Sequence, residues 1–129
     1  MTAVLNHTII PATDAKASAA FLSRILELDV APTWGPFVPL TVGNGVTLDF
    51  MDADASDFGE LHLAFLVDEA EFDGMFERIR ESGTAYYADP GRNQRGEINH
   101  RYGGRGVYFD DPDDHLMEII TQPYGSAPE

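Results

Sequence analysis

The chain has 129 residues, of which 43% are hydrophobic and 11% aromatic, as expected for one globular domain that buries a core. Its 22 acidic and 8 basic residues give a formal charge of −14, which argues against binding nucleic acid or an anionic membrane surface. The sequence has no cysteine, no apolar run of membrane-spanning length and no signal-peptide pattern, so we expect a cytoplasmic protein without disulfides or thiolate chemistry.

The first predicted elements are a strand and a helix. The strand covers residues 4–10, places His7 on one face and ends at Pro11. Asp14 is a good N-cap for a helix that runs to Leu28. Helical spacing predicts that the buried stripe of this helix consists of Ala17, Phe21, Ile25 and Leu28.

A proline-rich segment follows, and it predicts a loop or an edge strand over residues 32–39. Residues 40–42 and 46–51 then flank Gly43-Asn44-Gly45, a pattern typical of a hairpin. In the second of these strands, alternation places Asp49 on the face opposite the apolar side chains.

The same layout begins again in the second half of the chain. Residues 61–67 predict a strand that carries His62. Asp68, with Glu71 three residues later, has the pattern of a capping box at the start of a helix that ends at Gly83. The buried stripe of this helix is predicted to consist of Phe72, Met75, Phe76 and Ile79. Further strands are predicted over residues 85–88, 106–110 and 116–121.

A strand, a helix and three strands therefore occur twice, over about residues 4–51 and 61–121, with an offset of about 55 residues. Such a repeat predicts two equivalent modules within one α+β domain. Each copy opens with a strand that carries a histidine and closes with one that carries a carboxylate. The candidate ligands at these equivalent places are His7, Asp49, His62 and Glu118.

Glu118 lies in an apolar strand, where a buried carboxylate is costly unless a cation accompanies it. Taken alone, Glu118 could pair with an arginine, and His7 or His62 could be an ordinary strand residue. Together they predict a metal site, because two imidazoles and one carboxylate leave about three positions open on an octahedral divalent ion. A substrate with two neighbouring oxygens can chelate at those positions.

Three stretches of sequence carry a family likeness, and they are Leu5-Asn6-His7, His62-Leu63-Ala64-Phe65 before a capped helix, and residues 106–113 running into Leu116-Met117-Glu118. Together they resemble the glyoxalase/bleomycin resistance/dioxygenase superfamily, also called the vicinal oxygen chelate fold. The resemblance covers nearly the whole chain. It implies an α+β fold in which two βαβββ modules form a curled mixed sheet around a cleft, and it implies a homodimer.

In this family the metal ligands lie on the first strand of each module and on the last strand, which carries over to His7, His62 and Glu118. Members of the glyoxalase I type add a ligand at the place of Asp49, where the shorter carboxylate makes coordination the weaker expectation. A site with three ligands is more similar to the extradiol dioxygenases and to the manganese-dependent fosfomycin resistance enzymes. The implied cofactor is a divalent metal, namely Fe, Mn, Zn or Ni.

Three further residues are candidates for catalysis. His100 could act as an acid or base, or it could be an exposed loop residue. Arg105 and Tyr108 could anchor an anionic or phenolic oxygen, although Tyr108 could equally belong to the core. His115 is predicted to be a turn residue. Half of the basic residues form either a solvated loop or a positive collar for an anionic small molecule, and they are Arg92, Arg95, Arg101 and Arg105.

The resemblance implies a metal-dependent enzyme whose small-molecule substrate chelates the metal through vicinal oxygens, in a dioxygenase, lyase or isomerase reaction. The alternative is a metal-free protein of the bleomycin resistance type that sequesters a ligand or drug. Retention of all three ligand types favours the enzyme. The strong acidity favours the alternative, because such proteins bind cationic drugs.

Overall fold

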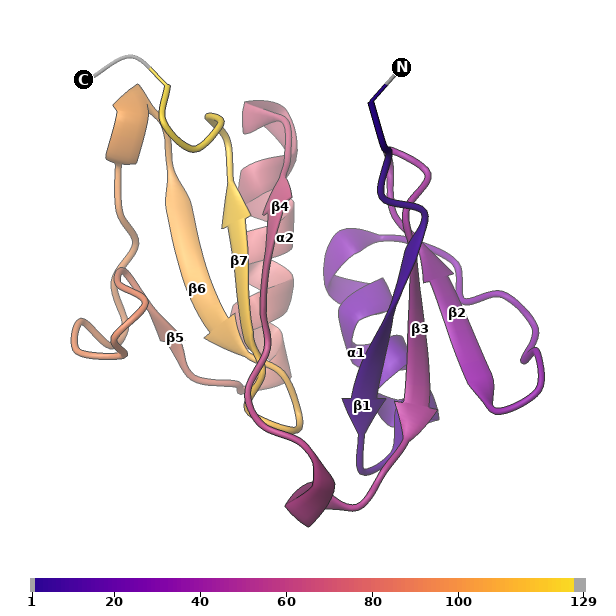
Figure 1. Ribbon diagram of the computed structural model, residues 1–129. Coiled ribbons are helices and arrows are strands. Elements are labelled where there is room, and N and C mark those ends of the chain that lie inside the picture. Colours follow the sequence, from indigo (N-terminus) through magenta and orange to yellow (C-terminus); the bar gives the residue numbers. More distant parts are fainter. Residues whose placement is uncertain (1, 127–129) are drawn as a thin grey trace. The chain divides into compact units, whose positions relative to one another are not determined.

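The computed structural model describes residues 2–126, and its contacts divide the chain into two units with the boundary between Gly59 and Glu60 (Figure 1). The elements of the first unit are β1 (His7–Ala12), α1 (Ala15–Leu26), β2 (Phe37–Thr41), β3 (Thr47–Asp52) and the 3-10 turn η1 (Ala55–Asp57). Those of the second unit are β4 (His62–Leu66), α2 (Glu69–Ser82), β5 (Tyr86–Tyr87), the 3-10 turn η2 (Arg101–Gly103), β6 (Gly106–Asp110) and β7 (Leu116–Ile120). No helix in the described chain is long and apolar enough to cross a membrane.

Each unit contains one mixed sheet. The strand order is β1-β3-β2 in the first unit and β4-β7-β6-β5 in the second. In both sheets the first strand of the unit runs parallel to the last, and the remaining neighbours are antiparallel. The predicted α+β class and the glyoxalase-like fold are confirmed.

The prediction of three strands after the first helix is wrong in one respect. The second unit has the full βαβββ order, whereas the described part of the first unit has only β2 and β3 after α1. An isolated antiparallel bridge between Val30 and Leu40 stands where β5 stands in the second sheet. Pro32 and Pro36 follow Val30, and because proline has no backbone N–H to donate, the pairing does not extend into a strand.

Helix α1 begins as predicted, because the Asp14 carboxylate accepts a hydrogen bond from the backbone N–H of Ala17 at 3.1 Å. Of the predicted stripe only Ile25 is buried, because Ala17 is exposed and Phe21 and Leu28 are only partly buried. Besides Ile25, the helix buries Ala15, Ser18, Ala19, Leu22 and Leu26. Helix α1 contains many alanines, which are apolar but small. Apolar residues therefore recur at helical spacing on more than one face, and the few large side chains do not indicate which face is buried.

Strand β1 begins three residues later than predicted and continues through Pro11 to Ala12. It lies at an edge of its sheet, where a proline removes a donor that the ladder does not need. The exposed face of the strand carries His7 and Ile9, and the opposite face buries Ile10 and Ala12.

Helix α2 was predicted closely. The Asp68 and Glu71 side chains form the expected capping box, and Gly83 ends the helix with a left-handed φ of 78°. The helix buries Phe72, Met75 and Ile79 as predicted, while Phe76 is only partly buried and packs edge-on against the Tyr86 ring.

The two units share one strand register. His7 lies opposite Thr47, and Asp49 follows two residues later on β3. In the second unit His62 lies opposite Leu116, and Glu118 follows two residues later on β7. The internal repeat therefore places the candidate ligands of the two units at equivalent positions.

Gly104 lies where the loop before β6 crosses the end of β7. A Cβ at this position would be 2.5 Å from Thr121 Oγ1 and 2.7 Å from Gln122 Cγ. We expect Gly104→Ala to lower the free energy of unfolding by about 1–3 kcal/mol, because the two segments would have to separate. Urea unfolding measures this change, with Gly43→Ala as the control because no atom lies within 4 Å of its added Cβ. Equal effects of the two substitutions would contradict the prediction.

Candidate active site

The candidate site lies on one face of the sheet in the second unit. Tyr108 on β6 and Ala64 on β4 are the cross-strand partners of Glu118 on β7, so Glu118 lies between a tyrosine and an alanine. His62 precedes Ala64 by two residues and therefore shares its face. The pleat of three adjacent strands thus brings His62, Glu118 and Tyr108 together.

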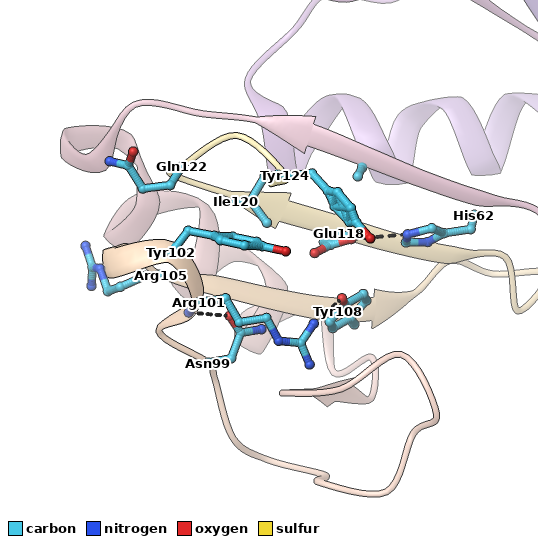
Figure 2. A pocket seen from close by; sticks show the side chains of 11 residues that line it. His62, Asn99, Arg101, Tyr102, Arg105, Tyr108, Glu118, Ile120, Gln122 and Tyr124 are labelled. Carbon is cyan, nitrogen blue, oxygen red and sulfur yellow. Dashed lines mark hydrogen bonds and ion pairs between the residues drawn. The ribbon is translucent and has the colours of Figure 1, made fainter. Parts of the chain in front are cut away.

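The imidazole of His62 is oriented by two contacts. Its Nδ1 lies 2.9 Å from the carbonyl oxygen of Leu116, and its Nε2 lies 3.1 Å from Oε1 of Glu118 (Figure 2). A carbonyl oxygen only accepts, so Nδ1 must carry the proton and donate it. In the neutral ring, the lone pair of Nε2 then faces the Glu118 carboxylate. Because both Nε2 and Oε1 are electron-rich, they attract each other only when a proton or a cation lies between them.

The residues of this pair fit a divalent metal. Two ligand atoms that each lie about 2.1 Å from one octahedral ion, at a right angle, are about 3 Å apart, which matches the observed spacing. A backbone carbonyl that fixes the tautomer of a ligating histidine is also typical of metal sites. Within the described residues of the second unit, no third histidine or acidic side chain joins His62 and Glu118 in a metal-binding group.

The other predicted ligands, His7 and Asp49, belong to the first unit. His7 is exposed, and its Nδ1 lies 2.7 Å from Oδ1 of Asn6, so this ring also donates from Nδ1 and leaves Nε2 available. Asp49 is partly buried in β3 at the position equivalent to Glu118. The coordination of a metal by these residues remains a prediction.

Tyr108 forms the wall of the site beside the ligand pair. Its hydroxyl oxygen accepts a hydrogen bond of 2.8 Å from Nη1 of Arg101, and its ring stacks on His62 with 5.9 Å between centroids. Burial raises the pKa of the Tyr108 phenol above its ordinary value, and the negative charge of Glu118 raises it further, while Arg101 opposes the shift. The phenol is therefore protonated at neutral pH and has a proton to donate.

Arg105 is already paired by two acids of helix α2. Its guanidinium lies 2.6 Å from Asp73 and 2.7 Å from Glu69, and it covers the Phe72 ring at 4.4 Å. The hydrogen bond with Asp73 raises the pKa of Arg105. In Figure 2 its head group points away from Glu118, although its residue lines the pocket. Its predicted role in binding substrate stays a prediction.

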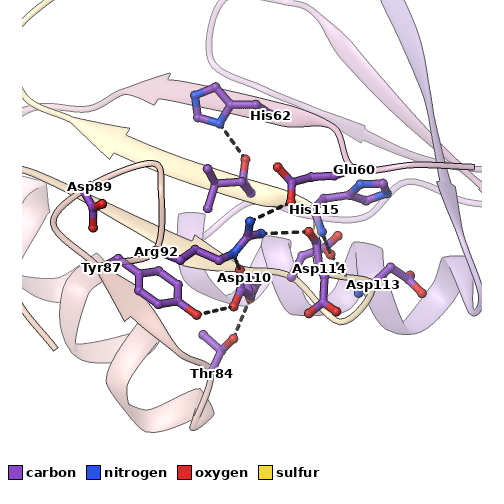
Figure 3. A network of polar contacts seen from close by, with 12 residues as sticks. Glu60, His62, Thr84, Tyr87, Asp89, Arg92, Asp110, Asp113, Asp114 and His115 are labelled. Carbon is purple, nitrogen blue, oxygen red and sulfur yellow. Dashed lines mark hydrogen bonds and ion pairs between the residues drawn. The ribbon is translucent and has the colours of Figure 1, made fainter. Parts of the chain in front are cut away.

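The predicted positive collar is only partly available for a ligand. Arg92 forms ion pairs with Glu60 at 2.7 Å and with Asp110 at 2.9 Å, and it donates to the carbonyl of Asp114 (Figure 3). Tyr87 donates to the same Asp110 carboxylate, so this arginine belongs to a structural network. Together with the paired Arg105, half of the four cations are thus bound to carboxylates.

His100 is exposed and directly precedes the 3-10 turn η2. Its neighbours Asn99 and Arg101 line the pocket. Its role as an acid or base stays a prediction.

A pocket of about 300 Å³ opens over the ligand pair. Its lining comes from the sheet face, the loop before β6 and the segment after β7, and consists of His62, Ala64, Asn99, Arg101, Tyr102, Arg105, Tyr108, Glu118, Ile120, Gln122 and Tyr124. The sequence predicted Arg101 only as a member of the candidate positive collar, and it did not indicate Tyr102 or Tyr124 as site residues. The signal for Tyr102 was the run of arginine, tyrosine and two glycines at residues 101–104, which is typical of a tight, exposed turn.

This topology, with a histidine on the first strand of each module and a carboxylate on the last, defines a glyoxalase-like α+β protein. The chain belongs to the Glyoxalase/Bleomycin resistance protein/Dioxygenase superfamily, whose family model matches residues 4–119. Among solved structures it is similar to Oxidase ChaP-H2, with 55% identity, a TM-score of 0.94 and 98% of both chains covered. It is similar to Oxidase ChaP-H1 with 51% identity, a TM-score of 0.91, and 97% of this chain and 100% of that chain covered.

Fosfomycin resistance proteins are more distant relatives. The structure of FosX from Listeria monocytogenes is 26% identical, with a TM-score of 0.72, and the match covers 98% of this chain and 97% of that one. Glutathione transferase FosA of Serratia marcescens is 28% identical over 122 residues, which are 89% of this chain and 78% of the relative. Metallothiol transferase FosB of Shouchella clausii (strain KSM-K16) is 37% identical over 60 residues, 46% of this chain. The match spans only 37% of the length of that relative.

We expect Tyr108 to titrate above pH 10 in chelator-treated protein. Because its folded pKa is raised above the unfolded value of about 10, the stability that the protonated phenol contributes is present below pH 10 and is lost as the pH rises through the folded pKa. Ultraviolet titration of tyrosinate should show late-ionising phenols, and Tyr108→Phe should remove one of them. Tyr87 should remain, because burial raises its pKa as well. Loss of an early-ionising phenol in Tyr108→Phe would contradict this assignment.

Proposed function

We propose that the protein is a metal-dependent oxidase that uses dioxygen to oxidise a small molecule bound through two neighbouring oxygens. The single observation that carries the proposal is the contact of 3.1 Å between His62 Nε2 and Glu118 Oε1 in the wall of a pocket. Similarity to Oxidase ChaP-H2 over 98% of both chains favours oxidation over the lyase and isomerase reactions. In this reaction dioxygen accepts the electrons that the substrate loses.

The divalent ion would be held by His62 and Glu118, with His7 of the same chain or of a second copy as the third ligand and Asp49 as the weaker candidate. When bound, the ion supplies Lewis acidity at the chelating oxygens and a route for electrons to dioxygen. His62 contributes a neutral nitrogen because Leu116 holds its proton on Nδ1. Glu118 contributes the negative charge, and a single carboxylate leaves the ion electrophilic.

Tyr108 and Arg101 act on the substrate side of the site. Arg101 donates to the Tyr108 oxygen, which leaves the phenolic proton for a substrate oxygen or for Glu118. Since burial keeps the phenol protonated, it can stabilise negative charge that develops on a substrate oxygen during oxidation. The proposal includes two further roles. His100 acts as an acid or base, and Arg105 anchors an anionic group of the substrate.

Metal analysis of protein purified without chelator tests the proposal first. We expect about one divalent ion per site, and oxygen consumption with catechols that is lost with a chelator and restored by Fe(II) or Mn(II). A protein that purifies without metal and binds ligands unaffected by chelator would be the sequestering protein. Thiol transfer to fosfomycin without oxygen uptake would identify a transferase. Light scattering with size-exclusion chromatography tests the expected homodimer.

A further inference from the structure

We propose that Tyr102 and Tyr124 form an aromatic clamp in this pocket and that Arg101 beside them binds an acidic oxygen of the ligand. The substrate is then a compact, planar aromatic molecule that carries an acidic oxygen. The inference rests on the proposed function, because it describes the occupant of the same pocket.

The first support is the backbone conformation of Tyr102. This residue has φ 57° and ψ 27°, in the left-handed region that glycine and asparagine occupy at little cost and that bulky residues rarely adopt. Gly103, the next residue, also has a positive φ of 75°. A turn alone would favour a small residue at both places. Strained residues cluster at ligand-binding sites. The Tyr102 side chain lines the pocket and points inward toward Glu118 in Figure 2.

The second support is that the loop carrying Tyr102 is fixed in place. Asn99 and Gly106 close its neck with two backbone hydrogen bonds of 2.9 Å, and the Asn99 side chain donates to the carbonyl of Ala88. The same side chain accepts a hydrogen bond from the backbone N–H of Arg101. At the other end of the turn, the backbone N–H of Arg105 donates to Thr121 Oγ1 at 2.9 Å, and the backbone N–H of Thr121 donates to the Arg105 carbonyl at 3.0 Å. A clamp held in this way loses little conformational freedom when a ligand binds.

The third support is the arrangement of the aromatic rings. The centroids of Tyr102 and Tyr124 are 6.0 Å apart and the ring planes meet at 65°, so the two rings pack edge to face, and both residues line the pocket. Tyr124 is 83% exposed even though it lines the pocket, which leaves most of its ring free to cover a ligand. Ala64 and Ile120 supply an apolar floor on the sheet. Aromatic faces and edges attract a flat π system more than a saturated one.

The charge of Arg101 selects the polar group of the ligand. Its guanidinium donates to the Tyr108 hydroxyl and lies 5.7 Å from the centre of that ring. Among the residues that the structure describes, no carboxylate forms an ion pair with Arg101, in contrast to Arg92 and Arg105. A cation in a pocket that no carboxylate neutralises attracts an anionic oxygen locally, in opposition to the formal charge of −14 of the whole chain.

Equilibrium binding of three probes tests the inference on the full-length protein, with its metal and after chelation. The first probe, 3-hydroxy-2-naphthoate, is planar and has an acidic oxygen next to a hydroxyl. Its saturated counterpart is 3-hydroxydecahydronaphthalene-2-carboxylate, and 2,3-dihydroxynaphthalene keeps the aromatic rings without the carboxylate. We expect Tyr102→Leu and Tyr124→Leu to weaken binding of the naphthoate by about tenfold and that of the saturated acid by less than about twofold.

Matched variants distinguish the contribution of the tyrosine ring from that of its hydroxyl, and effects within the pocket from effects elsewhere in the protein. Tyr102→Phe should bind the naphthoate within about twofold of the wild type, because it keeps the ring. Tyr86→Leu should have no effect, because Tyr86 packs on Phe76 and does not line the pocket. Arg101→Gln should weaken the naphthoate more than the diol.

Unchanged naphthoate binding in both leucine variants would overturn the clamp, as would an equal loss for the saturated acid or no binding by the wild type. If Tyr102→Leu does not fold by circular dichroism, Tyr124→Leu in the exposed segment after β7 decides. Failure of the proposed function gives a different result. In that case the aromatic preference persists, but no metal is found and chelation leaves every affinity unchanged.

Discussion

Glu118→Gln is expected to lower the affinity for the divalent metal by at least about 100-fold and to abolish metal-dependent oxygen consumption. The amide has the shape of the carboxylate but no negative charge, so the contact with His62 Nε2 at 3.1 Å no longer attracts a cation. The fold should persist, because Glu118 keeps its strand position between β4 and β6. Equilibrium dialysis followed by metal analysis measures the affinity directly.

The control for this prediction is Glu77→Gln, the same chemical change at a surface ion pair with Arg80 on α2. It should leave metal affinity and oxygen uptake unchanged. His62→Ala should reproduce the loss of metal seen in Glu118→Gln, because it removes the other member of the pair. Retention of metal at wild-type affinity in both site variants would refute the proposed metal centre.

His115→Ala is expected to lower the free energy of unfolding by about 3 kcal/mol. His115 is fully buried, and its Nδ1 accepts a hydrogen bond of 2.9 Å from the backbone N–H of Leu61, the residue before β4. Its own backbone N–H donates to the Asp111 carboxylate. Removing the ring leaves a cavity and a backbone donor without a partner. Urea unfolding of the metal-free protein measures the loss.

His115→Asn should recover part of this stability, because its side-chain oxygen can take the place of Nδ1 as the acceptor for Leu61. His100→Ala, at an exposed loop histidine, should change the free energy of unfolding by less than about 0.5 kcal/mol. A loss of that small size in His115→Ala would show that the buried hydrogen bond is dispensable.

The elements predicted well from the sequence are those with local chemical signals. Asp68 with Glu71 and Gly83 define both ends of α2, and the glycines at residues 43 and 45 define the hairpin. Burial in α1 was predicted correctly only for Ile25, because it depends on how the helix packs against β1, β2 and β3, and small side chains do not indicate which face does so. His115 was predicted to be a turn residue, and it does precede β7 directly. Its burial was missed because its hydrogen-bonding partner lies far away in the sequence.

The residues of the candidate site also fall into those that the sequence indicated and those that it did not. His62 and Glu118 were selected because they stand at equivalent places of a repeat and Glu118 is a carboxylate in an apolar strand, whereas Tyr108 could have been an anchor or a core residue. The structure brings the three side chains together within the second unit. Arg101 and Tyr102 lie in an irregular loop and Tyr124 in the segment after the last strand, where no periodicity indicates a direction. Their convergence depends on hydrogen bonds such as those of Asn99, which no sequence pattern specifies.

The common register of β1 with β3 and of β4 with β7 has a consequence for how such a protein evolves. Asp49 and Glu118 occupy matching places on matching backbones and differ by a single methylene group. Aspartate and glutamate codons differ only at their third base, so one nucleotide change can lengthen or shorten either carboxylate without disturbing a strand. Point mutations alone can therefore give proteins with this duplicated fold the same carboxylate in both units or a different one in each.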